Sequence, residues 1–158
     1  ILAVLADDVM LKESGGLDFK KVEKETKTGE GSEIETDKTG RASILYPNGT
    51  LANLSENTNL VIKNLNDSGS QSKLRLLTGS VWSKLQNVLG KGDLYEVETE
   101  NMVASVRGTE FRVDFANGVS VIEVFENKVE VQAIDPETGQ PIEGGFIELF
   151  AGEKVTVG

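Results

Sequence analysis

The sequence predicts an all-β fold, in the form of a stacked, solenoid-like or double-sheet domain with at most one short helical turn. Apolar and polar residues alternate along many short segments, which is the period of a strand with one buried face. Glycine is abundant at 17 residues and proline is scarce at three, a composition that favours frequent turns. Two Asn-Gly pairs, Asn48-Gly49 and Asn117-Gly118, each separate two such segments and are typical of β-hairpins.

The first half of the chain is expected to hold short strands divided by polar turns. Each segment carries Leu, Ile or Val and is bounded by Gly, Asn, Asp or Ser residues. The predicted strands are Leu2–Leu11, Glu33–Thr36, Ala42–Tyr46, Leu51–Leu54, Leu60–Leu65 and Leu74–Leu77. Val4-Leu5-Ala6 also fits the end of a signal peptide, but we expect a first strand there, with a signal or membrane anchor upstream.

The second half continues this pattern with longer alternating segments. The predicted strands are Ser80–Trp82, Leu94–Thr99, Val103–Val106, Glu110–Phe115, Val119–Glu126, Lys128–Ile134, Phe146–Phe150 and Val155–Val157. A helix is the competing interpretation for Ser80–Gly90, because Ser80 fits a helix cap and Gly90 a helix end. We expect a strand through Trp82 and a turn or short helix after it.

Part of the sequence is repeated in a degenerate form. Glu33–Asp37 (EIETD) recurs as Glu96–Glu100 (EVETE), and Ala42–Ile44 (ASI) recurs as Ala104–Val106 (ASV). An internal repeat predicts two similar units that stack their apolar faces. Chance similarity between β-rich segments is the alternative explanation.

The composition excludes several kinds of site. At 158 residues and 17.0 kDa, residues 1–158 are expected to form a single domain. The chain has neither cysteine nor histidine, which excludes disulfides, thiolate or imidazole metal ligands and histidine-based catalysis. A formal net charge of −10 disfavours nucleic acid and anionic lipid as partners. No apolar run approaches the ~20 residues of a membrane span, so no direct membrane insertion is expected.

The run Val103–Val113 (VASVRGTEFRV) interrupts an alternating strand with Arg107-Gly108-Thr109. A glycine in a strand marks a bulge or a close backbone approach, so we expect a kinked strand that carries a positioned arginine and resumes at Phe111. Two roles remain open for Arg107. Its guanidinium can hold backbone carbonyls and a carboxylate such as Glu98, Glu110 or Glu123, or it can anchor a binding partner. Thr109 is expected to satisfy a backbone group with its hydroxyl and is a second candidate binding residue.

Trp82 is the sole tryptophan and the third candidate binding residue. In an apolar strand it fits the core. Alternatively, its ring is a platform for carbohydrate, helped by Tyr46 or Tyr95, because a rigid aromatic face binds sugar rings.

The remaining polar residues do not favour an enzyme. Ser80 and Ser105 have no histidine to activate them. Glu98 and Glu100 are placed for a glycosidase pair, but alternating glutamates are also the ordinary solvated side of a sheet. The oxygen-rich loop Asn64–Gly69 lacks the bidentate glutamate of a calcium loop. We therefore expect no catalysis, no metal site and no cofactor.

Several motifs together resemble the FecR family. They are VETENMVASVRGTEFRV (Val97–Val113), VFENKVEV (Val124–Val131) and AGEKVTV (Ala151–Val157), preceded by the strand and turn order of Thr28–Leu54. Arg107-Gly108-Thr109 with the aromatic Phe111 is the specific part. Asn127 stands where the family often has glycine, and asparagine tolerates the left-handed conformation that such a position requires.

The resemblance implies a non-catalytic, extracytoplasmic domain of the bacterial envelope, in the periplasm or at the cell surface, with a role in signalling or protein–protein interaction. Its partner is expected to be another envelope protein. The alternative is a glycan-binding or adhesive module of a larger surface protein, with polysaccharide as ligand. Neither the ligand nor the oligomeric state follows from the sequence.

Overall fold

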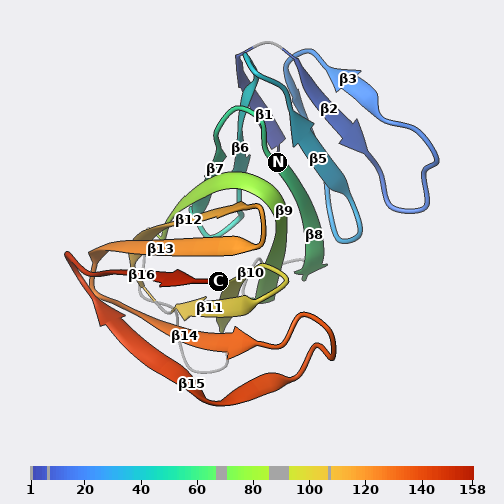
Figure 1. Cartoon of the computed structure of the whole chain (residues 1–158). Helices are drawn as coiled ribbons and strands as arrows, with labels where there is room; N and C mark the ends of the chain where they lie inside the picture. The colour runs from blue at the N-terminus through green and yellow to red at the C-terminus, as the bar shows by residue number, and fades with distance from the viewer. Residues whose placement is uncertain (1, 7, 67–70, 86–92, 107) are drawn as a thin grey trace.

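The computed structural model is built of strands in the residues that it describes, which are 2–6, 8–66, 71–85, 93–106 and 108–158 (Figure 1). No helix occurs in these ranges. The strands form a 16-stranded network of hydrogen-bonded pairs that is not closed into a barrel. We divide the network into sheets A and B, which share the strand β9 (Gln71–Lys84). The predicted all-β, double-sheet fold is confirmed.

Each sheet has one half of β9 near its middle. Sheet A contains, in spatial order, β4 (Glu25–Thr26), β1 (Leu2–Ala6), β6 (Arg41–Leu45), β7 (Leu51–Leu54), the C-terminal half of β9, β12 (Glu110–Ala116), β13 (Val119–Glu126) and β16 (Lys154–Val157). Sheet B contains β3 (Lys20–Val22), β2 (Val9–Lys12), β5 (Glu33–Thr36), β8 (Asn59–Leu65), the N-terminal half of β9, β10 (Leu94–Glu98), β11 (Met102–Val106), β14 (Lys128–Ile134) and β15 (Pro141–Phe150). All of these pairs are antiparallel except β9 with β10, which is parallel.

β9 passes from one sheet to the other at Gly79. Its N-terminal half pairs with β8 and β10 in sheet B, and its C-terminal half pairs with β7 and β12 in sheet A. Gly79 has a φ of 103°, and a Cβ there would lie 2.5 Å from the Cα of Thr58. The two predicted strands Leu74–Leu77 and Ser80–Trp82 are therefore one bent strand, and only glycine fits its bend. The alternative helix over Ser80–Gly90 is wrong for Ser80–Lys84, because these residues belong to β9. Residues 86–92 lie outside the described part of the chain.

Apolar side chains from both sheets form one core. In β12, Phe111, Val113 and Phe115 are buried, in the phase that the sequence predicts. The core also contains two buried tyrosines, Tyr46 and Tyr95, whose hydroxyls are hydrogen-bonded. The hydroxyl of Ser72 donates to the hydroxyl of Tyr46 at 3.0 Å, and the Tyr95 and Ser83 hydroxyls lie 2.7 Å apart. The two tyrosine rings meet edge to face at 5.8 Å. Burial raises the pKa of both tyrosines well above the usual range.

Most predicted strands are present, and four match to the residue. These are Glu33–Thr36, Leu51–Leu54, Val119–Glu126 and Lys128–Ile134. The predicted strand Leu2–Leu11 is wrong as a single element, because the chain leaves sheet A for sheet B near Asp8, where φ is 63°. β3 and β4 are too short and too polar to give a strand pattern. The predicted Asn117-Gly118 hairpin turn is present, with φ positive at both residues.

The sequence repeat corresponds to a repeated hydrogen bond between the sheets. Thr36, which ends β5 in sheet B, donates its hydroxyl to the carbonyl of Ser55 at 2.7 Å, just beyond β7 of sheet A. Thr99, the equivalent residue after β10, has its hydroxyl 2.7 Å from that of Ser120 in β13 of sheet A. The strands that follow pair differently, since β10 and β11 form a hairpin while β5 and β6 lie in different sheets. In both repeats, therefore, a threonine at the end of a sheet B strand forms a hydrogen bond that links this sheet to sheet A.

Candidate functional site

The chain passes from sheet B to sheet A between Val106 and Glu110, where Gly108 and Thr109 are the described residues of the Arg-Gly-Thr segment. β11 ends at Val106 and pairs in sheet B, whereas β12 begins at Glu110 and pairs in sheet A. The kinked single strand expected from the sequence is therefore wrong, and the segment is a corner between sheets. We call residues 107–109 the RGT corner. Arg107 lies outside the described residues, so its predicted contacts with carboxylates stay predictions.

Thr109 fixes the corner from inside the protein. Its side chain is fully buried, and its hydroxyl donates a hydrogen bond to the carbonyl of Glu126 at the end of β13. Its own carbonyl accepts a hydrogen bond from the Leu85 amide at 3.1 Å. Phe111 is also fully buried, and its ring meets that of Tyr95 edge to face at 6.2 Å. Since Thr109 is not exposed, it can influence a partner only by positioning the corner.

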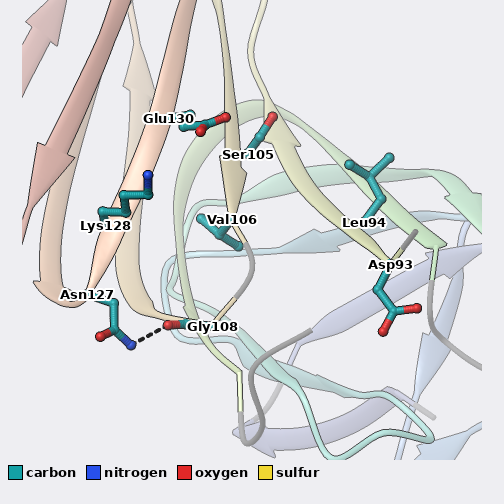
Figure 2. Close-up of a pocket in the computed structure, with 8 residues that line it drawn as sticks. All are labelled: Asp93, Leu94, Ser105, Val106, Gly108, Asn127, Lys128 and Glu130. Carbon is teal, nitrogen blue, oxygen red and sulfur yellow. Dashed lines mark hydrogen bonds between the residues drawn. The ribbon is translucent and has the colours of Figure 1, made fainter. Parts of the chain in front are cut away.

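Asn127 fastens the RGT corner to a second corner, between β13 and β14. It has a φ of 58°, as expected for asparagine at a position where the family often has glycine. Its side-chain amide donates a hydrogen bond to the carbonyl of Gly108, drawn as the dashed line in Figure 2. Its own carbonyl accepts a hydrogen bond from the amide of Ala151 at 2.9 Å. The sequence showed the backbone conformation of Asn127 and not this side-chain contact.

A cavity of about 560 Å³ opens beside the RGT corner, at the end of sheet B where β10 and β14 begin and β11 ends. β10, β11, β14 and the two corners supply its lining. The described lining residues are Asp93, Leu94, Ser105, Val106, Gly108, Asn127, Lys128 and Glu130 (Figure 2). In size it is comparable to a pocket for a small molecule or for a few side chains of a protein partner.

The cavity lining combines apolar side chains with charges of both signs. Leu94 and Val106 are apolar, while Lys128 and Glu130 are exposed neighbours on the outer face of β14. The Lys128 ammonium lies 3.6 Å from the carboxylate of Glu148, and the hydroxyl of Ser105 donates to Glu96 at 2.6 Å. This mixture suits a partner that brings both polar and apolar groups. No local pattern marks these residues as a group, because the pairing of β11 with β14 brings them together.

Trp82 lies apart from this cavity, on the outer face of sheet A. It is half-buried, which makes it neither a core residue nor a fully exposed platform. Its cross-strand neighbours are Asn53 in β7 and Arg112 in β12. The Arg112 guanidinium is held by Asp114 at 3.2 Å and by Glu123 at 3.4 Å. Tyr46 and Tyr95 are buried in the core, so they cannot join Trp82 in a sugar platform.

The structure does not bring together the carboxylate pair considered for a glycosidase, and the described residues hold no metal-binding cluster. Glu98 is paired with Lys73 at 3.4 Å and with Arg75 at 3.5 Å, whereas Glu100 lies in the turn after β10, so the two carboxylates do not share a strand. In the described ranges, no three acidic side chains gather where they could hold a metal ion. Part of the loop Asn64–Gly69 lies outside those ranges. A helix with the length and hydropathy of a membrane span is likewise absent from the described residues.

Comparison with protein families identifies the scaffold. The family model described as FecR protein matches residues 32–130, from the start of β5 to the middle of β14. The match covers more than half of the chain and includes the RGT corner. The chain belongs to the FecR family. The resemblance seen in the sequence motifs is thereby confirmed.

Solved structures show the same FecR-type fold. Two crystal structures of a protein assigned as an anti-sigma factor from Parabacteroides distasonis ATCC 8503, at 1.65 and 2.50 Å resolution, each match with a TM-score of 0.62. Their identities to this chain are 18% and 17%, over 79% of its length. The chain spans about half of that protein, 54% of its length. No curated protein matches the chain.

Proposed function

We propose that residues 1–158 form a single FecR domain that acts as a non-catalytic sensory and protein-interaction module of the bacterial envelope, outside the cytoplasm. The observation that carries the proposal is the position of the family's Arg-Gly-Thr motif, at a corner that borders the cavity on sheet B. Family membership supports a regulatory role. The assignment of the structural relative as an anti-sigma factor points in the same direction.

In this proposal, a second envelope protein docks over the cavity. Lys128 and Glu130 give the docking its charge specificity, and the half-buried Leu94 supplies apolar contact area, whereas Val106 is almost fully buried. Arg107 anchors the partner, because arginine is enriched among the residues that dominate binding energy. The hydrogen bonds from Thr109 and Asn127 hold the two corners in place, so the docking surface is preorganised.

A glycan-binding or adhesive module is the second candidate. It is favoured by one observation, the half-exposed ring of Trp82 between Asn53 and Arg112 on the outer face of sheet A. An amide and a guanidinium beside an aromatic face could hydrogen-bond to the hydroxyls of a polysaccharide whose ring stacks on the tryptophan. In this case the ligand would contact the opposite sheet from the cavity.

The two candidates are separated by capture from an envelope extract of the source organism, with soluble polysaccharide as competitor. We expect the wild-type chain to capture a protein that polysaccharide does not displace. We expect Arg107→Ala and Lys128→Glu to lose this capture and Trp82→Ala to keep it. Capture abolished by polysaccharide, or by Trp82→Ala alone, would contradict the interaction module and support the glycan module.

Controls keep misfolding apart from loss of binding. Lys63→Glu makes the same charge change as Lys128→Glu at an exposed site on β8, so it should retain capture. Arg107→Lys keeps the charge but loses the planar, bidentate donor group. If Arg107→Lys melts at a lower temperature, its role is structural, whereas a stable variant that fails to bind supports recognition.

A further inference from the structure

β15 is the outermost strand of sheet B and leaves one of its edges open. Among the described strands it pairs only with β14, and it lies at the outer margin of the molecule in Figure 1. The backbone amides and carbonyls along such an edge are free to pair with another extended chain. The matched family region ends at residue 130, so β15 is an addition to the part of the fold that the family model covers.

The open edge is regular over only a short stretch. Phe146–Phe150 pair residue by residue with Lys128–Gln132, and the register then shifts before Pro141. Gly144, with a φ of 76°, lies within that shift. Proline and irregular backbone are features that limit edge-to-edge pairing. At the other end, the Phe150 amide donates to the Glu153 carboxylate at 2.7 Å and the Phe150 carbonyl accepts from the Glu153 amide at 2.9 Å, so the available edge is confined to Phe146–Leu149.

This stretch displays two aromatic rings with an acidic residue between them. Phe146 is 54% exposed and Phe150 is 52% exposed, whereas Leu149 on the inner side is buried. Because side chains alternate along a strand, Phe146, Glu148 and Phe150 point to the same outer face. Phe146 and Phe150 therefore offer two separate apolar contacts, one on each side of Glu148.

The acidic residue between the rings faces a second carboxylate. Glu148 is directly opposite Glu130 in β14, and like charges in that arrangement destabilise a sheet. Among the described residues, one cation lies within ion-pair distance of these two carboxylates, namely Lys128, at 3.6 Å from Glu148. A cation added next to Glu148 would therefore reduce the repulsion between the carboxylates of Glu148 and Glu130.

We propose that the edge Phe146–Leu149 accepts an extended segment of a partner protein that carries an arginine or lysine with an apolar side chain two residues away on either side. The backbone of the segment extends sheet B, its cation faces Glu148, and its apolar side chains pack on Phe146 and Phe150. This pattern is symmetric, so it fits in either strand direction. The inference rests on the proposed function, and it names the chemistry of the partner.

A second copy of this chain fits the edge poorly. Antiparallel pairing of two copies about the centre of the regular stretch would place the two Glu148 side chains opposite each other. Each copy also carries a net charge of −10, which opposes self-association. Charge complementarity thus selects a basic, apolar-flanked segment over a copy of the chain.

The test uses the whole 158-residue chain and a synthetic peptide, Thr-Ile-Thr-Arg-Thr-Ile-Thr, with a matched peptide in which Glu replaces Arg. Binding is followed by fluorescence anisotropy and by hydrogen exchange of the β15 amides. We expect the Arg peptide to bind and to protect amides within Phe146–Leu149, whereas the Phe150 amide already donates to Glu153 in the free chain. We expect Glu148→Lys to weaken the Arg peptide roughly tenfold or more and to favour the Glu peptide, since a close charge pair is reversed.

Two matched variants control for general effects. Glu143→Lys makes the same charge change on β15 outside the regular stretch, and it should leave the preference for the Arg peptide unchanged. Phe146→Ser should weaken binding, whereas Phe125→Ser, which removes a comparably exposed ring on β13, should not. A cooperative thermal transition in each of the four variants would show that all of them fold.

Three results would overturn the inference: no binding of the Arg peptide to the wild-type chain, an unchanged preference in Glu148→Lys, or dimerisation of the chain that depends on Phe146. Failure of the proposed function is a separate result. If the envelope partner is captured equally by wild type and Glu148→Lys, the interaction module stands and this edge is not its docking site. If no protein is captured but the Arg peptide still binds with the expected preference, the inference about the edge stands. The proposal that the partner is an envelope protein is then wrong.

Discussion

The hydroxyl groups of Tyr95 and Ser83 lie 2.7 Å apart in the centre of the core, one from β10 of sheet B and the other from the sheet A half of β9. Both side chains are almost completely buried. Their hydrogen bond therefore joins the two sheets at a place that water does not reach. A buried hydroxyl without a partner costs free energy, so the two residues depend on each other.

Tyr95→Phe is expected to lower the free energy of unfolding by about 1–2 kcal/mol, because the Ser83 hydroxyl loses this partner inside the core. The fluorescence of Trp82, the sole tryptophan, gives a convenient signal for unfolding in urea. Ser83→Ala in the Tyr95→Phe background should recover part of the loss, since no orphaned hydroxyl remains. If the double variant is as unstable as the sum of the single variants, the coupling is absent.

Stability should fall in alkaline solution. Tyr46 and Tyr95 are the only tyrosines, and burial raises the pKa of each above the ordinary 10.0. Above pH ~10 the unfolded chain loses the tyrosine protons while the folded chain keeps them, so the free energy of unfolding decreases as pH rises. The decrease approaches about 1.4 kcal/mol per pH unit for each tyrosine. Below pH ~10 the two groups give no pH dependence.

Absorbance at 295 nm measures ionised tyrosine and checks this prediction. We expect the signal to rise together with loss of the β-sheet circular dichroism, at a pH above 10. A rise near pH 10 in a chain that keeps its native dichroism would contradict the burial of the two hydroxyls.

Gly79→Ala is expected to destabilise the fold by about 2–5 kcal/mol, through a strained positive φ together with overlap on the backbone of Thr58. Gly139→Ala is the matched control. Its φ of 73° imposes similar strain, but a Cβ there meets no atom within 4 Å, so it should cost about 1 kcal/mol. Thermal unfolding of both variants separates the two causes, and equal costs would show that the bend of β9 tolerates a side chain.

The link between the two corners can be tested at Asn127. Asn127→Ala removes the hydrogen bond to Gly108 and places alanine at positive φ, for an expected loss of about 1–2 kcal/mol. Asn127→Gly removes the same bond but suits the backbone, so it should be more stable than the alanine variant. Partner capture by the glycine variant then reports whether the side-chain link matters for binding. An alanine variant as stable as wild type would show that neither effect operates.

Strand positions followed from local pattern, and sheet membership did not. Val119–Glu126 and Lys128–Ile134 were predictable to the residue because their alternation is long and Asn127 separates them. The passage between sheets at Gly79 and at the RGT corner was not predictable, because a bulge and a change of sheet leave the same glycine in the sequence. The sequence predicts two separate strands on either side of Gly79 and a bulge within a strand at Gly108.

From the sequence, a residue could be assigned to the candidate site only where a motif or its own residue type identified it. The family motif pointed to Gly108 and Thr109, and the left-handed conformation of Asn127 was expected from the resemblance to a family that often has glycine there. Lys128, Glu130 and Ser105 join the same cavity through pairing between β11 and β14. Charged and hydroxyl residues on an exposed strand face look alike wherever they occur, so nothing local marked these three.

The sharing of β9 between the sheets has a consequence for synthesis of the chain. β7 and β8, which pair with one side of β9, are made before it, whereas β10 and β12, which pair with the other side, are made after it. When the ribosome has just completed β9, both halves of the strand therefore have an open edge, one in each sheet. Such edges recruit strands from other molecules. The nascent domain is most exposed to misassembly at this midpoint, and it becomes protected only when β12 has emerged and paired.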